Sequence, residues 1–131
     1  MKQEPARDHG EAVSVNIAPN DLAVIGHVLL PYARFVRFVI PPSRERGITL
    51  TMVENLRRRI ANVSKEGKEG EQFPLTVADL SIIDAALRNF VANLRYMFPP
   101  SRERDETIVA CEGLRGYLAA SFSPCEGRNE K

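Results

Sequence analysis

The side chains in this sequence that are best suited to chemistry are arginines. The hexapeptide Pro-Pro-Ser-Arg-Glu-Arg occurs at residues 41–46 and again, unchanged, at residues 99–104. Guanidinium groups bind phosphates and carboxylates through paired hydrogen bonds, and the free N–H groups at a helix N-terminus attract the same anions. A run of three arginines follows at residues 57–59. The hypothesis of an anion-binding or nucleic-acid-binding site therefore rests on seven residues: Arg44, Arg46, Arg57, Arg58, Arg59, Arg102 and Arg104.

The same arginines also have a structural interpretation, in which they pair with neighbouring glutamates and bind carboxylates within the fold. Residues 31–60 hold seven arginines and two glutamates, whereas the whole chain has a net charge of only +1. A chain with so little excess charge is not a general electrostatic binder of nucleic acid, so such a role would need this local patch. The sequence leaves open whether the two hexapeptides meet at one end of the molecule.

Catalytic groups are scarce. The two histidines, His9 and His27, have no companion ligands, and the two cysteines, Cys111 and Cys125, form neither a zinc motif nor a disulfide framework. Cys111 lies on an apolar helix face, which predicts a core position. We predict that the protein is not an enzyme and that it holds no cofactor and no metal. The low cysteine usage and the polar start of the chain predict a cytoplasmic location.

The repeated hexapeptide belongs to a longer internal repeat. Residues 21–61 align without a gap to residues 79–119, an offset of 58, with sixteen identities in forty-one positions. Most other pairs exchange one apolar residue for another. This pattern predicts two copies of one supersecondary unit.

Each copy is predicted to be a pair of antiparallel helices. In the first copy apolar residues recur at intervals of three and four from residue 22 to residue 39, and the second copy repeats this spacing from residue 80 to residue 97. Thr76 and Asp79 form a capping-box pattern, and the paired prolines of each hexapeptide end the first helix of each copy. The second helix starts either at Ser43 and Ser101 or at Thr49 and Thr107, and the sequence does not decide between them. The predicted fold is all-α, a four-helix bundle made of two tandem αα-hairpins.

The predicted boundaries follow from this pattern. Residues 1–17 are expected to be a flexible arm, residues 18–63 the first repeat, residues 64–75 a linker, residues 76–122 the second repeat and residues 123–131 a flexible tail. Pro31, in the middle of the first helix, predicts a local kink.

The first helix has more apolar surface than its counterpart in the second copy. A helix that is apolar nearly all round is buried on more than one side. We interpret the surplus face as a self-association surface formed by Val24, Val28, Phe35 and Phe38. The alternative is that this helix is the central helix of a monomer, covered by the N-terminal arm. Two arginines and a proline within it argue against a membrane span.

The predicted function is therefore that of a helical protein-interaction module that forms a homo-oligomer, binds a protein partner and does not contact a membrane. The alternative is nucleic-acid or phosphate binding through the repeated hexapeptides and the arginines at residues 57–59.

Two stretches also carry a resemblance to a known family. PPSRERGITL followed by LRRRIANVSKEG resembles the second-helix region of the small four-helix-bundle family that includes the ribosomal-RNA intervening-sequence protein and the accessory protein of diversity-generating retroelements. ADLSIIDAALRNFVANLRYM is similar to the third helix of that family. The resemblance implies a ring-forming helical bundle that binds nucleic acid or a reverse-transcriptase partner.

Overall fold

The computed structural model describes residues 12–66 and 72–122, and within these residues the protein is mostly helical. Four long helices confirm the predicted helical class. The described part of the chain also contains a short two-stranded ribbon that the sequence analysis did not predict. In chain order the elements are β1 (Val13–Asn16), α2 (Pro19–Val39), α3 (Arg44–Glu66), β2 (Gln72–Leu75), α4 (Val77–Met97) and α5 (Arg102–Phe122).

Local signals set the ends of α2 and α4. Helix α2 begins at Pro19, whose missing N–H costs nothing in the first turn, and it remains helical through Pro31. Helix α4 begins with the predicted capping box: the Thr76 hydroxyl accepts the Asp79 N–H, and the Asp79 carboxylate accepts the Thr76 N–H, both at 3.0 Å. Both helices end in extended backbone immediately before a Pro-Pro pair.

The serines of the hexapeptides start the second helix of each hairpin. Ser43 Oγ accepts the N–H of Arg46 at 3.1 Å, and Ser101 Oγ accepts the N–H of Arg104 at 3.0 Å. Helices α3 and α5 begin at the next residue in each case. The alternative starts at Thr49 and Thr107 are therefore wrong, because the serine caps satisfy N–H groups a full turn earlier.

The short ribbon corrects two predicted boundaries. Strands β1 and β2 pair antiparallel, with Val15 opposite Phe73. Val15 and Ile17 are buried and anchor residues 13–17 to the core, so this stretch is not a flexible arm. Phe73 and Leu75 are also buried, so residues 72–75 are not part of a linker. The two-residue alternation of four-residue strands, one of them interrupted by a proline, is too short to stand out in the sequence.

Other predicted boundaries are settled in part. Helix α3 extends to Glu66, three residues beyond the predicted end of the first repeat, and α5 extends to Phe122, the last residue that the structure describes. The rest of the predicted arm (1–11), the middle of the predicted linker (67–71) and the predicted tail (123–131) lie outside the described residues.

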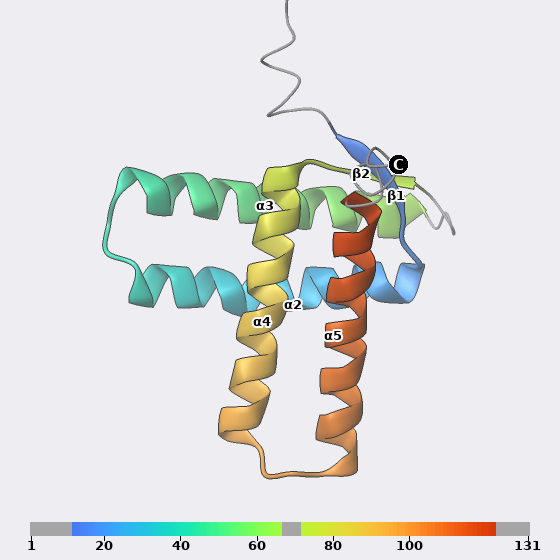
Figure 1. Ribbon diagram of the computed structural model, residues 1–131. Coiled ribbons are helices and arrows are strands. Elements are labelled where there is room, and N and C mark those ends of the chain that lie inside the picture. The colour runs from blue at the N-terminus through green and yellow to red at the C-terminus, as the bar shows by residue number, and fades with distance from the viewer. Residues whose placement is uncertain (1–11, 67–71, 123–131) are drawn as a thin grey trace, which may run out of the picture.

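The two helix pairs lie across each other. In Figure 1, α2 and α3 run antiparallel, and α4 and α5 form a second antiparallel pair that crosses the first, with its tip pointing in a different direction. Helix α4 packs against both α2 and α3 at the crossing. The core lies there, between helix faces that include Ile25, Leu29, Ile83 and Leu87, and under the ribbon. The two hexapeptide turns are therefore far apart (Figure 1).

Candidate interaction surfaces

Two arginines of the hexapeptides have the same structural role in both hairpins. Arg46 Nη1 donates to the backbone oxygens of Arg37 and Ile40, at 3.2 and 3.3 Å. Arg104 Nη1 donates to the backbone oxygen of Phe98 at 3.1 Å, and Phe98 lies 58 positions after Ile40. Each guanidinium therefore caps carbonyl groups at the end of the preceding helix. This role explains both arginines without a ligand.

The other hexapeptide arginines do not gather into one site. Arg102 pairs with Glu106 at 2.9 Å on the exposed surface of α5. Arg44 is exposed and has no hydrogen bond or ion pair among the described residues. Because the two turns lie at the separate tips of the crossed hairpins (Figure 1), the four arginines cannot act on one small anion.

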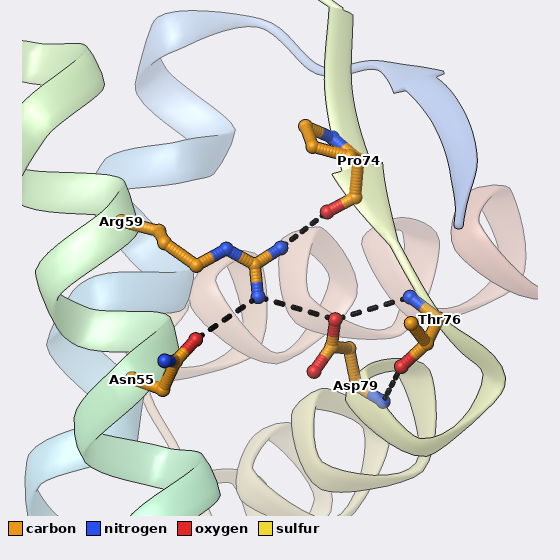
Figure 2. A network of polar contacts seen from close by, with 5 residues as sticks. All are labelled: Asn55, Arg59, Pro74, Thr76 and Asp79. Atoms are coloured by element: carbon orange, nitrogen blue, oxygen red, sulfur yellow. Dashed lines mark hydrogen bonds and ion pairs between the residues drawn. The ribbon is translucent and has the colours of Figure 1, made fainter. Parts of the chain in front are cut away.

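Arg59 joins the two hairpins. Figure 2 shows its guanidinium donating to the side chains of Asn55 and Asp79, at 3.4 and 3.2 Å, and to the backbone oxygen of Pro74. The group also lies 5.2 Å from the centre of the Phe73 ring. Asp79 is buried and receives the capping bond from Thr76 on the same oxygen. A buried carboxylate needs such a partner, so Arg59 is an internal ion-pair residue and not a free anion ligand.

The counterpart of Arg59, 58 positions later, is Tyr117. Its hydroxyl donates to the backbone oxygen of Asn16 at 2.5 Å, and Asn16 is in turn the counterpart of Pro74. A hydrogen bond from helix to strand therefore occurs at both matching places, from α3 to β2 and from α5 to β1, but a tyrosine supplies no positive charge. The carboxylate of Asp21, the counterpart of Asp79, has no hydrogen bond or ion pair among the described residues.

An open groove lies on the Asp21 side of the molecule, between α2 and α5. It has a volume of about 570 Å³. Its floor is apolar, and its polar border holds three carboxylates. The lining residues are Asp21, Ala23, Val24, His27, Val28, Phe90, Glu103, Glu106, Thr107, Ala110, Cys111 and Leu114.

A difference in side-chain volume accompanies the groove. Ala110 lines it from α5 and is exposed, whereas its counterpart on α3 is Met52, which packs against the core. A longer side chain fills space that a methyl group leaves empty. Helix α3 accordingly packs on α4, and α5 leaves a groove against α2.

The polar groups of the groove are suited to binding and not to covalent chemistry. Burial, and to a smaller degree the nearby Glu112 carboxylate, raises the pKa of the Cys111 thiol, which keeps it protonated and unreactive. The ring of His27 contacts Phe90 edge-on, with ring centres 5.8 Å apart. Within residues 12–66 and 72–122, no group of three or more His, Cys, Asp or Glu side chains is placed to hold a metal ion. Asp21, Glu103 and Glu106 instead favour a cationic, partly apolar ligand.

The four residues predicted to form the self-association surface are divided between two places. Val28 is fully buried under the groove and Val24 lies partly buried beside it, so these two residues do not form one exposed surface with Phe35 and Phe38. The reason is that the second hairpin crosses this part of α2. Phe35 and Phe38, beyond the crossing, are 41% and 88% exposed. The exposed surface at the tip of the first hairpin, here called the α2 tip, consists of Arg34, Phe35, Arg37, Phe38 and Val39.

The α2 tip differs in charge from the tip of the second hairpin. Residues 34–48 hold four arginines and one glutamate, whereas the matching residues 92–106 hold three arginines and three carboxylates. Both tips expose an aromatic side chain at the same position, Phe38 in one and Tyr96 in the other. Helix α2 also has the length and hydropathy of a helix that could cross a membrane, but core helices of soluble proteins share these two properties.

Comparison of the chain with protein-family models, curated proteins and solved structures gives no match. The resemblance to the four-helix-bundle family therefore stays a prediction.

Proposed function

We propose that this protein is a non-enzymatic interaction module that self-associates, with the α2 tip of one copy docking into the groove between α2 and α5 of a second copy. The observation that carries the proposal is the exposure of Phe35 and Phe38 at the end of α2, next to the exposed Val39. Soluble proteins rarely leave a contiguous apolar surface exposed to water, so a surface of this kind indicates an interaction site. This chain itself contains an apolar groove whose charge is opposite to that of the α2 tip.

Charge complementarity supports a second copy as the occupant. The α2 tip places Arg34 and Arg37 beside Phe38, and the groove has an apolar floor with Asp21, Glu103 and Glu106 at its border. Opposite charges around an apolar contact set the orientation and the rate of association. Because the tip and the groove are different surfaces, each copy offers one of each, and repeated docking gives a ring or a chain.

The expected affinity is moderate. Burial of the two phenyl groups contributes roughly 1.5–3 kcal/mol each, and much of this gain is offset by the loss of translational and rotational freedom on association. We therefore expect association at micromolar concentrations.

Light scattering with matched variants tests this proposal. The wild-type mass should be at least twice 14.7 kDa and should fall toward the monomer value in Phe38→Ala. The control is Tyr96→Ala, which removes the equally exposed aromatic group of the other tip and should leave the mass unchanged. A monomeric wild-type protein at about 100 µM, well above the expected range, would refute the proposal.

We also infer that the chain is a tandem duplication of one β-α-α unit. The bounds of α4 are those of α2 shifted by 58, and α5 begins 58 residues after α3. The ribbon places Val15 opposite Phe73, its own counterpart. The hydrogen bonds from Arg59 to Pro74 and from Tyr117 to Asn16 are also counterparts. This pattern supports a local two-fold relation between the halves. An experimental structure in which residues 19–61 and 77–119 do not superimpose would overturn the inference.

A further inference from the structure

The second half of the molecule contains an arginine whose carboxylate partner has no counterpart in the first half. On α4, Asp84 accepts a hydrogen bond from Arg115 Nε at 2.7 Å and lies 3.4 Å from Arg88 Nε. Arg115 also donates to Glu112 at 2.7 Å. The hydrogen bond to Asp84 is the main cause that raises the pKa of Arg115. Two carboxylates and two guanidinium groups therefore balance each other.

In the first half the same arginine and one of its partners are retained. Arg57, the counterpart of Arg115, donates to Glu54, the counterpart of Glu112, at 2.9 Å. The counterpart of Asp84, however, is Gly26, which has no side chain.

A pocket of about 340 Å³ lies beside Gly26, between α2 and α3. It is lined by Gly26, Glu54, Arg57, Arg58, Ile60 and Ala61. The counterpart of Arg58 in the second half is Gly116. Arg58 and Arg57 both line the pocket and give it two guanidinium groups. Arg58 is exposed and has no hydrogen bond or ion pair among the described residues. Two guanidinium groups and one carboxylate leave one positive charge unbalanced.

We propose that the pocket between α2 and α3 binds a carboxylate group from outside the chain, in the place that Asp84 occupies in the second half. Arginine binds carboxylates through directed N–H···O bonds, and the geometry of the Asp84–Arg115 pair shows how such a group reaches this arginine. The carboxylate comes either from a free small acid or from an aspartate or glutamate side chain of a partner protein. In both cases the bound group is a single carboxylate. This site is independent of the tip-to-groove contact proposed above.

The pocket can be filled from within by one substitution. A Cβ atom placed on Gly26 would lie 3.4 Å from Ile60 Cγ2, which is an ordinary contact distance. Gly26→Asp therefore places a carboxylate in the pocket and should exclude an external one. Gly26→Asn has nearly the same size without the charge and is the matched control.

The test follows the arginine Nε–Hε signals of the full chain by NMR as sodium acetate replaces sodium chloride at constant ionic strength. We expect the Arg57 signal to move in a saturable way, with half-saturation between about 10 and 100 mM, as for one or two charge-assisted hydrogen bonds. The Arg115 signal should stay in place, because Asp84 already occupies it. The response should disappear in Gly26→Asp and should weaken less in Gly26→Asn, whose side chain fills the same space without the charge.

Each alternative result has a definite meaning. Equal movement of the Arg57 and Arg115 signals, or an unchanged response in Gly26→Asp, would overturn the proposal. Inorganic phosphate that binds ten times more tightly than acetate would also overturn it, in favour of a phosphate site. The blocked peptide acetyl-Ala-Glu-Ala-amide distinguishes the two sources: tighter binding than acetate assigns the site to an acidic side chain of a partner, and equal or weaker binding assigns it to a free acid.

Discussion

The two sides of the α2–α4 contact are built from matching positions but end in different states. On one side α3 packs on α4, and Arg59 pairs with the buried carboxylate of Asp79. On the other side α5 faces α2, with Tyr117 in place of the arginine and the carboxylate of Asp21 without a partner among the described residues. The first side is closed and the second has a groove of about 570 Å³. The two sides therefore differ in charge and in packing at positions that match in the sequence alignment.

The largest expected effect comes from breaking the closed side. Arg59→Ala leaves Asp79 buried without its cation and removes the contact with Phe73, so we expect a loss of about 3 kcal/mol in the free energy of unfolding. Tyr117→Phe removes one hydrogen bond on the open side and should cost about 1 kcal/mol. Urea unfolding measures both. Equal losses would mean that the two sides are held in the same way.

A smaller effect tests whether the two hairpin turns are equivalent. Ser43→Ala and Ser101→Ala each remove one N-cap hydrogen bond, and each should lower the free energy of unfolding by about 1 kcal/mol. Thermal unfolding of the two variants should therefore give the same shift. A large effect at one turn and none at the other would show that the turns have different roles.

A reverse substitution should make the open side resemble the closed one. By the two-fold relation inferred above, Tyr117→Arg places a guanidinium group near Asp21, as Arg59 lies near Asp79. We expect a gain of about 0.5 kcal/mol, because the new pair is only partly buried. The gain should vanish when Asp21→Asn is added. Partial neutralisation of the groove should also weaken self-association in the light-scattering experiment.

The smallest expected effect is a pH dependence to which Cys111, on the open side, contributes. Burial raises the pKa of Cys111, so the folded state favours the protonated thiol. The added stability is fully present below the pKa of the thiol in the unfolded chain, about 8.5. It is lost as the pH rises through the pKa of the thiol in the folded protein. Tyr32 acts in the same direction at higher pH, because burial raises its pKa more than Arg88 lowers it. Cys111→Val, which copies Val53 of the other half, should remove the contribution of the thiol to this pH dependence. Urea midpoints measured from pH 7 to 10 check this.

The helices and their ends could be predicted because local signals determine them. The apolar spacing, the Pro-Pro pairs, the serine caps and the Thr76–Asp79 capping box all act within a few residues along the chain. The ribbon was missed because strands of four residues give too short a period, and its pairing depends on residues 58 apart.

The uses of the arginines could not be predicted because they depend on long-range contacts. Nothing near Arg59 in the sequence indicates that it contacts Asp79 and Pro74. Arg46 donates to backbone carbonyl groups only because the turn folds back on α2. One signal was present, however. Aligning the two halves places Gly26 against Asp84, and Gly26 lines the pocket between α2 and α3. It also places Tyr117 against Arg59, the residue that pairs with Asp79.

Charge-swapped variants test the central claim, docking of the α2 tip into the groove of another copy, most directly. One variant carries Arg34→Glu and Arg37→Glu, which reverses the tip, and the other carries Glu103→Arg and Glu106→Arg, which reverses the groove border. Light scattering should show each variant alone as a monomer and a 1:1 mixture of the two as an oligomer, since the reversed tip then meets a reversed groove. Two variants that associate as well as wild type, or a mixture that stays monomeric, would contradict the account.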